Sequence, residues 1–133
     1  MNKIKFKYFK KKSGSLVAFS LKKSFPIKTK RIFIINGQKN FTRGDHAHKK
    51  CSQFLFPVLG KIKINCISKT TKRTILLNHK EMEGYLVKPL TWCKIKFLTK
   101  NAILLVVCDM EYDFKDYIED FSKFLKIIKE KNI

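Results

Sequence analysis

Apolar and polar residues alternate with a period of two through much of this sequence. This is the period of a β-strand, whose successive side chains point to opposite faces. The alternation is clearest in two sets of residues, Ile4, Phe6 and Tyr8, and Ile62, Ile64 and Cys66. Further β-rich segments are expected at residues 16–19, 32–35, 74–77, 85–87, 92–98 and 102–107, separated by Asn, Gly, Lys and Pro residues that are typical of turns. Eight or more strands at this spacing favour an all-β sandwich or jelly roll.

The period changes near the C-terminus, where apolar residues recur at intervals of three and four. This spacing predicts one apolar stripe on an α-helix, made of Tyr117, Ile118, Phe121, Phe124, Leu125 and Ile128. Asp113 is the expected N-cap of this helix, and Asp116 is expected in its first turn, where a carboxylate is favourable. The predicted fold is therefore a β jelly roll closed by one C-terminal helix that packs on the barrel.

The length and composition predict one folded domain that spans residues 1–133. The sequence is 44% hydrophobic and contains 12 Phe, which is enough apolar material for a core. We find no linker, repeat or low-complexity segment. A length of 133 residues is also too short for two ordinary domains.

The segments at the N-terminus and in the interior argue against a membrane protein. The first residues, MNKIKFKYFKKK, lack the apolar core of a signal peptide, and the longest apolar run, from Ala102 to Cys108, is too short to span a bilayer. The cysteines at 51, 66, 93 and 108 form no C-x-x-C pair, and we expect reduced thiols. A cytoplasmic protein without a membrane partner is predicted. The formal net charge of +20 attracts polyanions, although most lysines alternate with apolar residues and indicate solvated strand faces.

The segment from Arg43 to Gln53, RGDHAHKKCSQ, contains the residues best suited to chemistry. His46 and His48 are two positions apart and would project from the same face of a strand. If this face lines the barrel interior, two imidazoles meet in one cavity. Imidazole titrates near neutral pH and can both accept and return a proton.

The spacing of His46, His48, Gln53 and Gly60 is similar to the first motif of the cupins, many of which bind a metal. Metal-binding cupins add a carboxylate and a third histidine, but this sequence has Gln53 at the first position and Cys93 at the second. Two imidazoles and a neutral amide make a poor divalent site, although a Cys93 thiolate could in principle complete one. We expect neither a metal nor another cofactor.

Three motifs together resemble one family of cupins, the dTDP-4-keto-6-deoxyglucose 3,4-ketoisomerases, which are also called WxcM-like or FdtA-like. The motifs are R-G-x-H-A-H-K-K-x-x-Q, P-x-x-W and the tail YDFKDYIEDF, and the resemblance runs from about Arg31 to Phe124. It implies a metal-independent jelly roll that moves the ketone of a dTDP-linked 6-deoxy sugar from C4 to C3. The product would supply an aminotransferase in the synthesis of a 3-amino-3,6-dideoxy sugar for surface glycans such as lipopolysaccharide.

The resemblance also implies a homodimer with exchanged N-terminal strands. The alternating segment from Ile4 to Phe9 supports this, because it would otherwise present an unpaired strand edge. The sequence departs from the family at Ile34, where a Tyr is frequent, and at Cys93, where a His or Arg usually faces the sugar. The configuration at C4 of the product, gluco or galacto, therefore stays open.

The chemistry implied by the resemblance is enolisation, because the C3 hydrogen of a 4-keto sugar is α to the carbonyl. His48 is the expected base, and His46 would orient it or polarise the sugar oxygens. Arg43 and Lys50 are the expected partners of the diphosphate.

Three further residues are expected to bind the sugar. Gln53 would hydrogen-bond a hydroxyl or the base, and Cys93 would face the sugar. For Trp92, stacking on a ring and packing in the core are equally compatible with the sequence.

Three other functions remain as alternatives. A nucleotide-sugar 3,5-epimerase uses the same enolisation in a similar jelly roll, but it lacks the R-G-x-H-A-H-K-K run. A metal-dependent cupin oxygenase would contain iron or manganese. A basic nucleic-acid-binding β-barrel would use the charge of +20 and the 12 Phe, 4 Tyr and 1 Trp, and it predicts aromatic and basic residues clustered on one face.

Overall fold

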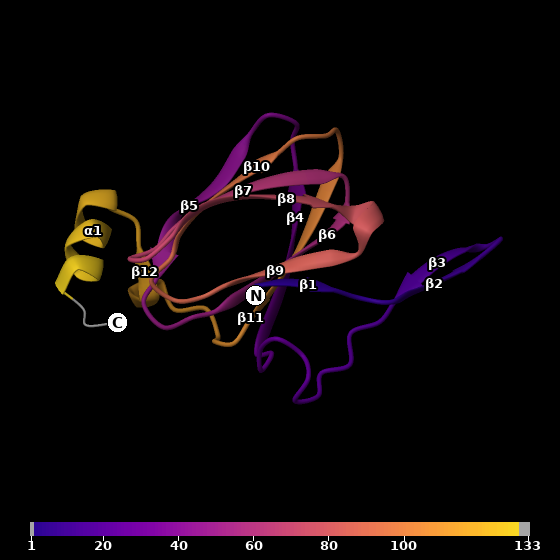
Figure 1. Ribbon diagram of the computed structural model, residues 1–133, viewed down its shortest axis with the longest axis horizontal. Coiled ribbons are helices and arrows are strands. Elements are labelled where there is room, and N and C mark those ends of the chain that lie inside the picture. The colour runs from indigo at the N-terminus through magenta and orange to yellow at the C-terminus, as the bar shows by residue number, and fades with distance from the viewer. Residues whose placement is uncertain (1, 131–133) are drawn as a thin grey trace.

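The computed structural model describes residues 2–130 of the chain. Two five-stranded antiparallel sheets, of order β1-β9-β6-β11-β4 and β12-β5-β10-β7-β8, lie face to face (Figure 1). The elements are β1 (Lys3–Lys5), β2 (Tyr8–Lys11), β3 (Gly14–Val17), β4 (Arg31–Gly37), β5 (Thr42–His48), β6 (Gln53–Leu59), β7 (Lys61–Ile67), β8 (Lys72–Asn78), η1 (His79–Glu81), β9 (Glu83–Val87), β10 (Trp92–Phe97), β11 (Ala102–Cys108), η2 (Phe114–Asp116), β12 (Tyr117–Ile118) and α1 (Phe121–Glu130). The predicted jelly roll with a C-terminal helix is confirmed.

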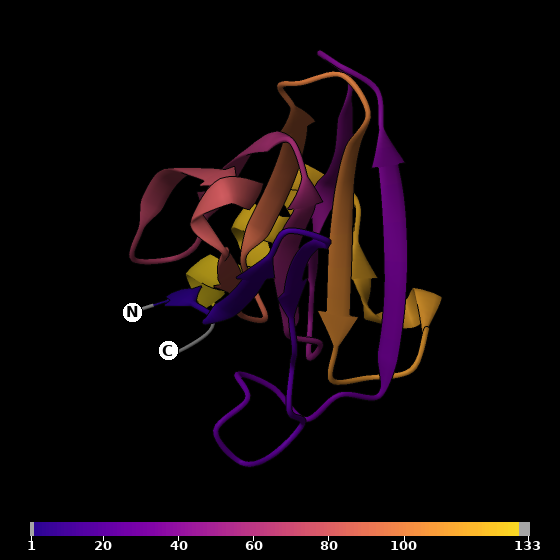
Figure 2. The same cartoon turned by 90° about the vertical axis from the view of Figure 1, so that its right-hand side faces the viewer.

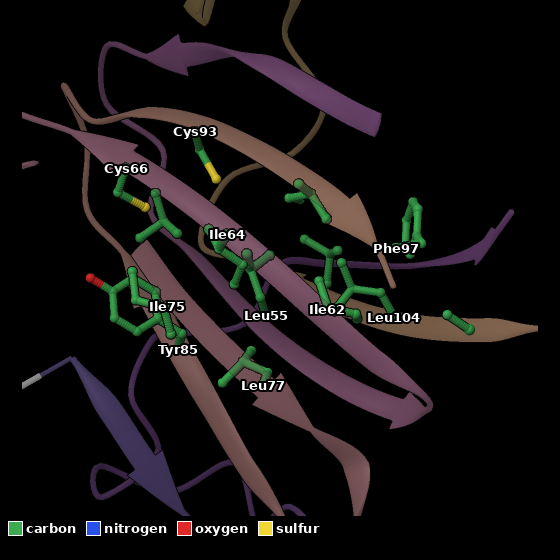
Figure 3. Packing of buried hydrophobic residues seen from close by; sticks show 14 of the residues in the cluster. Leu55, Ile62, Ile64, Cys66, Ile75, Leu77, Tyr85, Cys93, Phe97 and Leu104 are labelled. Carbon is green, nitrogen blue, oxygen red and sulfur yellow. The ribbon is translucent and has the colours of Figure 1, made fainter. Parts of the chain in front are cut away.

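The core lies between the two sheets and is built from the inward side chains of alternating strands. On β7 the inward residues Ile62, Ile64 and Cys66 are buried, as their period of two predicted. Leu55 and Leu104 meet them from the opposite sheet (Figure 3). Each fully buried side chain of this size contributes about 1.5–3 kcal/mol relative to exposure, so this packing holds the two sheets together.

Strand β6 was not predicted because it lacks the alternating pattern. Its inward residue Leu55 belongs to the core, while Phe54 and Phe56 point to the outer face of the same sheet. That face is covered by the N-terminal segment: the Phe6 ring lies 5.6 Å from Phe54, and the Phe19 ring lies 4.9 Å from Phe56. A strand covered on both faces reads as a continuous apolar run.

The N-terminal strand expected from Ile4 to Phe9 is interrupted, which corrects the prediction. Strand β1 pairs with β9 only as far as Lys5, and the Phe6 N–H then donates to the Met82 carbonyl at 2.8 Å. Met82 has a positive φ of 52°, because the chain turns there out of η1. Strand β9 begins at Glu83, so the residues after Phe6 have no further part of β9 to pair with. The chain instead forms the β2–β3 hairpin, which extends away from the two sheets (Figure 1).

The C-terminal helix begins at Phe121, later than expected. Asp113 caps the short helix η2 by accepting a hydrogen bond from the Lys115 N–H, and Asp120 caps α1 by accepting from the Ser122 N–H at 2.9 Å. Between the two helices, β12 pairs with β5. Tyr117 and Ile118, the first two residues of the predicted helical stripe, therefore form a strand along the edge of β5 instead of a helix.

The predicted packing of α1 on the barrel is confirmed. Phe124 and Ile128 are its buried residues, and they pack with Ala47 and Trp92 on the outer face of the second sheet. The helix lies at one end of the molecule in Figure 1, and it lies behind the sheets in Figure 2. Within residues 2–130, α1 and the other helical segments fall short of the length and apolar character that crossing a bilayer requires.

Candidate active site

A bulge in β5 brings Arg43 to the same face as the histidines. In the pairing with β10, Cys93 lies opposite His46 and Lys94 lies opposite Gly44, so Asp45 is an extra residue without a partner. Gly44 and Asp45 have positive φ angles of 84° and 64°. Arg43 and His46 are three positions apart and would face opposite sides of a regular strand. The extra residue reverses this and turns both toward the interior.

A cavity of about 440 Å³ opens between the two sheets at this bulge. Four of the residues singled out from the sequence line it together: Arg43, His46, Gln53 and Cys93. Tyr117 and Glu119, which the sequence analysis did not assign to a site, complete its polar wall, and Phe33, Leu55 and Val106 contribute to its apolar wall. The cavity thus combines an apolar floor with a few convergent polar groups, as small-molecule sites do.

His48 is buried beside this cavity and is held by Asp116. The Nδ1 atom of His48 lies 3.1 Å from Asp116 Oδ2, and the same carboxylate accepts hydrogen bonds from the backbone N–H groups of Lys50 (2.8 Å) and Cys51 (3.2 Å). Because a carboxylate can only accept, Nδ1 carries the proton of the imidazole. The Nε2 atom is then the nitrogen with the free lone pair. It is buried and has no hydrogen-bond partner within residues 2–130.

Both imidazoles are shifted toward the neutral form. Burial lowers the pKa of His46, against an opposing effect of the Gly44 backbone and of Glu119. Burial also lowers the pKa of His48, reinforced by the neighbouring His46 and opposed by Asp116. The two ring centroids are 5.0 Å apart. Two neutral imidazoles at neutral pH are able to accept protons.

Tyr117 and Arg31 complete the cluster around the histidines. Tyr117 lies opposite His48 in the pairing of β12 with β5, and its ring centroid is 4.4 Å from that of His48 and 4.9 Å from that of His46. Arg31 lies on β4 and shares the half-buried face of Phe33. Its guanidinium lies 3.6 Å from Cys108 Sγ, and its charge interacts with the Tyr117 side chain.

Sequence reasoning missed the roles of Arg31, Asp116 and Tyr117. Asp116 and Tyr117 were assigned to the first turns of the helix, although both belong to the tail that carried the family resemblance. Arg31 begins the strand in which only the departure at Ile34 was noted. The signal available for Asp116 and Tyr117 was their place in the tail motif, and for Arg31 it was the start of the family resemblance at this residue.

Two predicted substrate-binding residues lie away from the cavity. Trp92 is buried, its Nε1–H donates to Asp45 Oδ1 at 2.9 Å, and its ring packs 5.5 Å from Phe124 of α1. Of the two interpretations of Trp92, packing in the core describes its place in the fold. The side chain of Lys50 is exposed, and the contribution of this residue to the site is its backbone N–H, which holds Asp116.

The four cysteines are free and buried, and they lie in two contacting pairs. Cys93 donates a hydrogen bond to Cys66, which lies near it in the core (Figure 3), and this bond together with burial raises the pKa of Cys93 well above its usual range. Cys93 therefore presents a neutral thiol to the cavity. The hydrogen bond from Cys51, with help from Arg31, lowers the pKa of Cys108 to about 6 against the effect of burial.

His48, Cys51 and Asp116 are a second group to consider for a metal, since their ligand atoms lie within 4.8 Å of one another. The Asp116 oxygens, however, already accept the two backbone N–H groups and the imidazole. This arrangement matches a hydrogen-bonded cluster that orients His48.

Comparison with known proteins identifies the chain's relatives. The family model described as FdtA, WxcM-like, C-terminal, matches residues 1–129. A curated relative from Aneurinibacillus thermoaerophilus, named TDP-4-oxo-6-deoxy-α-D-glucose-3,4-oxoisomerase, is 30% identical over 131 residues, which are 98% of this chain and 94% of that protein.

Solved structures agree with this comparison. The sugar 3,4-ketoisomerase QdtA from Thermoanaerobacterium thermosaccharolyticum, in complex with TDP, has a TM-score of 0.89 and 32% identity over 98% of this chain and 96% of its own. A His-to-Asn mutant of QdtA in complex with TDP-4-keto-6-deoxyglucose has a TM-score of 0.89 and 31% identity over 98% of this chain and 95% of its own. The resemblance that the sequence motifs indicated is confirmed.

Proposed function

The chain belongs to the FdtA (WxcM-like, C-terminal) family, and from this we propose that it is a sugar-nucleotide 3,4-ketoisomerase. It is an isomerase that binds a TDP-linked keto-sugar, and its substrate is TDP-4-keto-6-deoxyglucose, which becomes the 3-keto-6-deoxyhexose. The observation that supports this function most directly is the cavity lined by His46, Arg43 and Gln53, beside which the buried His48 keeps a free lone pair on Nε2. The product is suited to an aminotransferase that makes a 3-amino-3,6-dideoxy sugar.

In the proposed mechanism, His48 Nε2 removes the proton from C3 of the sugar. Electrons from the C3–H bond form a C3–C4 double bond, and the C4 carbonyl oxygen becomes the oxygen of an enediol. His48 then returns its proton to C4, and the O3 proton is exchanged through solvent for a proton on O4, so that the ketone lies at C3. The reaction exchanges only protons, so His48 ends in its starting state. Asp116, held by two backbone N–H groups, stabilises the imidazolium that forms in between.

Substrate binding draws on the other side chains of the cavity. Arg43 projects into it and offers two parallel donors to the diphosphate. Gln53 lines it from β6 and would reach a sugar hydroxyl, and Cys93 faces the sugar as a neutral thiol. His46 would polarise the sugar oxygens. Trp92 and the Lys50 side chain lie away from the cavity, so the structure gives no support for their predicted contacts with the substrate.

We further propose a homodimer in which the N-terminal strands are exchanged. The β2–β3 hairpin pairs only with itself among the described residues, and it exposes 57% of Phe9 and 59% of Leu16. On the outer face of edge strand β4 (Figure 2), Ile32 and Ile34 are 53% and 61% exposed. A second copy of the chain would cover both apolar regions. The residues 1–133 would act as one domain in each protomer.

A cytoplasmic location fits the buried thiols, because four free cysteines in contacting pairs persist in a reducing compartment. The charge of +20 favours the approach of a dianionic nucleotide-sugar and requires no nucleic acid as partner.

The experiment that tests the function is incubation of the purified protein with TDP-4-keto-6-deoxyglucose, followed by proton NMR. We expect the ketone to move from C4 to C3, and the couplings at C4 of the product to give its gluco or galacto configuration. Unchanged substrate would overturn the proposal. A product that keeps its ketone at C4 but is inverted at C3 and C5 would identify a 3,5-epimerase instead.

A further inference from the structure

We propose that Tyr117 is a catalytic hydrogen-bond donor to the sugar oxygen that gains negative charge during isomerisation, and that Arg31 is the positioning residue that aims it. This inference rests on the proposed function and adds two residues to it. Neither was assigned a role from the sequence. The proposal stands on the place of Tyr117 in the cavity, on the contact of its ring with both imidazoles, and on the contacts that hold Arg31.

Tyr117 lies beside both histidines at the wall of the cavity. Its backbone belongs to β12, directly opposite His48 of β5, and its half-buried ring lines the cavity. The ring centroid lies within 4.9 Å of the centroids of both His46 and His48. A sugar placed within reach of His48 Nε2 would therefore also lie beside the Tyr117 side chain.

The contact with Arg31 determines which way the phenol hydrogen points. A guanidinium has only N–H donors and a positive charge, so its favourable interaction with Tyr117 turns the phenol oxygen, and not the hydroxyl hydrogen, toward Arg31. The hydroxyl hydrogen of Tyr117 is then left for another acceptor. Arg31 is itself held on three sides, by Cys108 Sγ at 3.6 Å and by the rings of Phe33 and Tyr112, which lie 5.1 and 5.3 Å from its Cζ.

The reaction needs such a donor. When His48 removes the C3 proton, negative charge develops on the oxygen at C4, and His46, whose lowered pKa favours the neutral form, offers this oxygen a single N–H donor. A preorganised hydrogen bond from Tyr117 stabilises this charge in the transition state more than in the bound ketone. The cation of Arg31 behind the phenol strengthens the donor. No proton has to leave Tyr117, so the proton balance of the proposed mechanism is unchanged.

The test compares Tyr117→Phe with Tyr112→Phe. The Tyr112 ring packs beside Arg31 and beside the Tyr117 ring, but of these two tyrosines only Tyr117 lines the cavity. Loss of one donor to a developing oxyanion lowers kcat by about 10²–10³-fold, which is the fall expected for Tyr117→Phe with little change in KM. Tyr112→Phe should leave both constants near those of the wild type. The phenylalanine keeps the ring packing, and equal TDP affinity and equal melting temperature would show that the fold is intact.

Substrate deuterated at C3 gives a second readout. The kinetic isotope effect on kcat should be larger in Tyr117→Phe than in the wild type, because C–H cleavage becomes more fully rate-limiting when the enediolate is less stable. A purely structural role of Tyr117 would not raise it.

Arg31→Lys and Arg31→Gln test the positioning residue. Lysine keeps a cationic donor and should restore part of the kcat that glutamine loses, without a matching change in KM. Near-normal kcat in Tyr117→Phe, or equal kcat in the two Arg31 variants, would overturn the inference while the isomerase function stands. Absence of turnover in the wild type would instead overturn the function and the inference with it.

Discussion

At the scale of single residues, the proposed chemistry depends on one imidazole nitrogen that the fold leaves without a partner. Asp116 fixes the tautomer of His48 and directs its lone pair away from the carboxylate. Burial keeps the ring neutral. The second histidine, His46, lines the cavity itself and is better exposed to the substrate. These differences assign the roles of base and polarising group, and they can be separated by mutation and by pH.

Replacing His48 by Asn should lower turnover and leave TDP binding intact. Asparagine keeps the polarity but lacks a nitrogen that titrates, and a general base contributes roughly 10²–10⁴-fold to the rate. The measurement is kcat by NMR, with TDP affinity by calorimetry. His79→Asn is the matched control, because His79 accepts a hydrogen bond from the Gly60 N–H at 3.0 Å, outside the residues that line the cavity. Near-normal turnover in His48→Asn would move the base to His46.

The lowered pKa values of His46 and His48 predict a dependence on acid. A base must be neutral, so kcat/KM should rise with pH through a pKa below the ordinary 6.5 and be level above it. The unfolded chain binds protons at these histidines at higher pH than the folded protein does. The free energy of unfolding should therefore fall as pH drops below about 6.5. An acid limb in kcat/KM with a pKa above 6.5 would contradict the proposed burial effect.

At the scale of elements, the bulge in β5 is what converts a local sequence motif into a site. Gly44 has a φ of 84°, and a Cβ at this position would meet the Cys93 carbonyl oxygen at 2.9 Å. The extra residue Asp45 turns outward and accepts a hydrogen bond from Trp92. Arg43 and His46 consequently share one face. The bulge therefore places Asp45 on the side of the sheet that α1 covers, and Arg43 and His46 on the side that faces the cavity.

Gly44→Ala should destabilise the protein and weaken substrate binding together. A non-glycine residue in this strained conformation costs of order 1–3 kcal/mol, and the contact with Cys93 adds to it. Urea unfolding and KM for the TDP-sugar measure the two effects. Gly14→Ala is the control, because Gly14 also has a positive φ, of 141°, but its Cβ would meet open space in the hairpin. Equal losses of stability in the two variants, with unchanged KM, would argue against a role for the bulge.

At the scale of the whole molecule, the exposed apolar regions of the hairpin and of β4 predict association. Phe9 and Leu16 lie opposite each other in the hairpin and are both more than half exposed. Sedimentation at micromolar concentration should give a mass near twice the 15.7 kDa of one chain. The double variant Phe9→Ser, Leu16→Ser should shift this mass toward one chain. Leu76→Ser, at a residue 60% exposed on β8, is the control and should leave it unchanged. A wild-type mass of a single chain would contradict the dimer.

The sequence by itself determined the fold class and the core of the site. A period of two is a local property, so it predicted inward residues such as Ile62 and Ile64 without knowledge of their partners. It also put His46 and His48 on one face. The family motifs added the substrate class, and both the family and the jelly roll are confirmed.

Only the tertiary structure decided the residues around His48 and the place of Trp92. The spacing of Tyr117 and Ile118 fits a helix as well as a strand, and the free edge of β5 decided between them. The bulge at Asp45 likewise depends on the register of β10, which no local pattern contains. Contacts of this kind join residues far apart in the chain, such as His48 and Asp116, and their geometry exists only once the strands have paired.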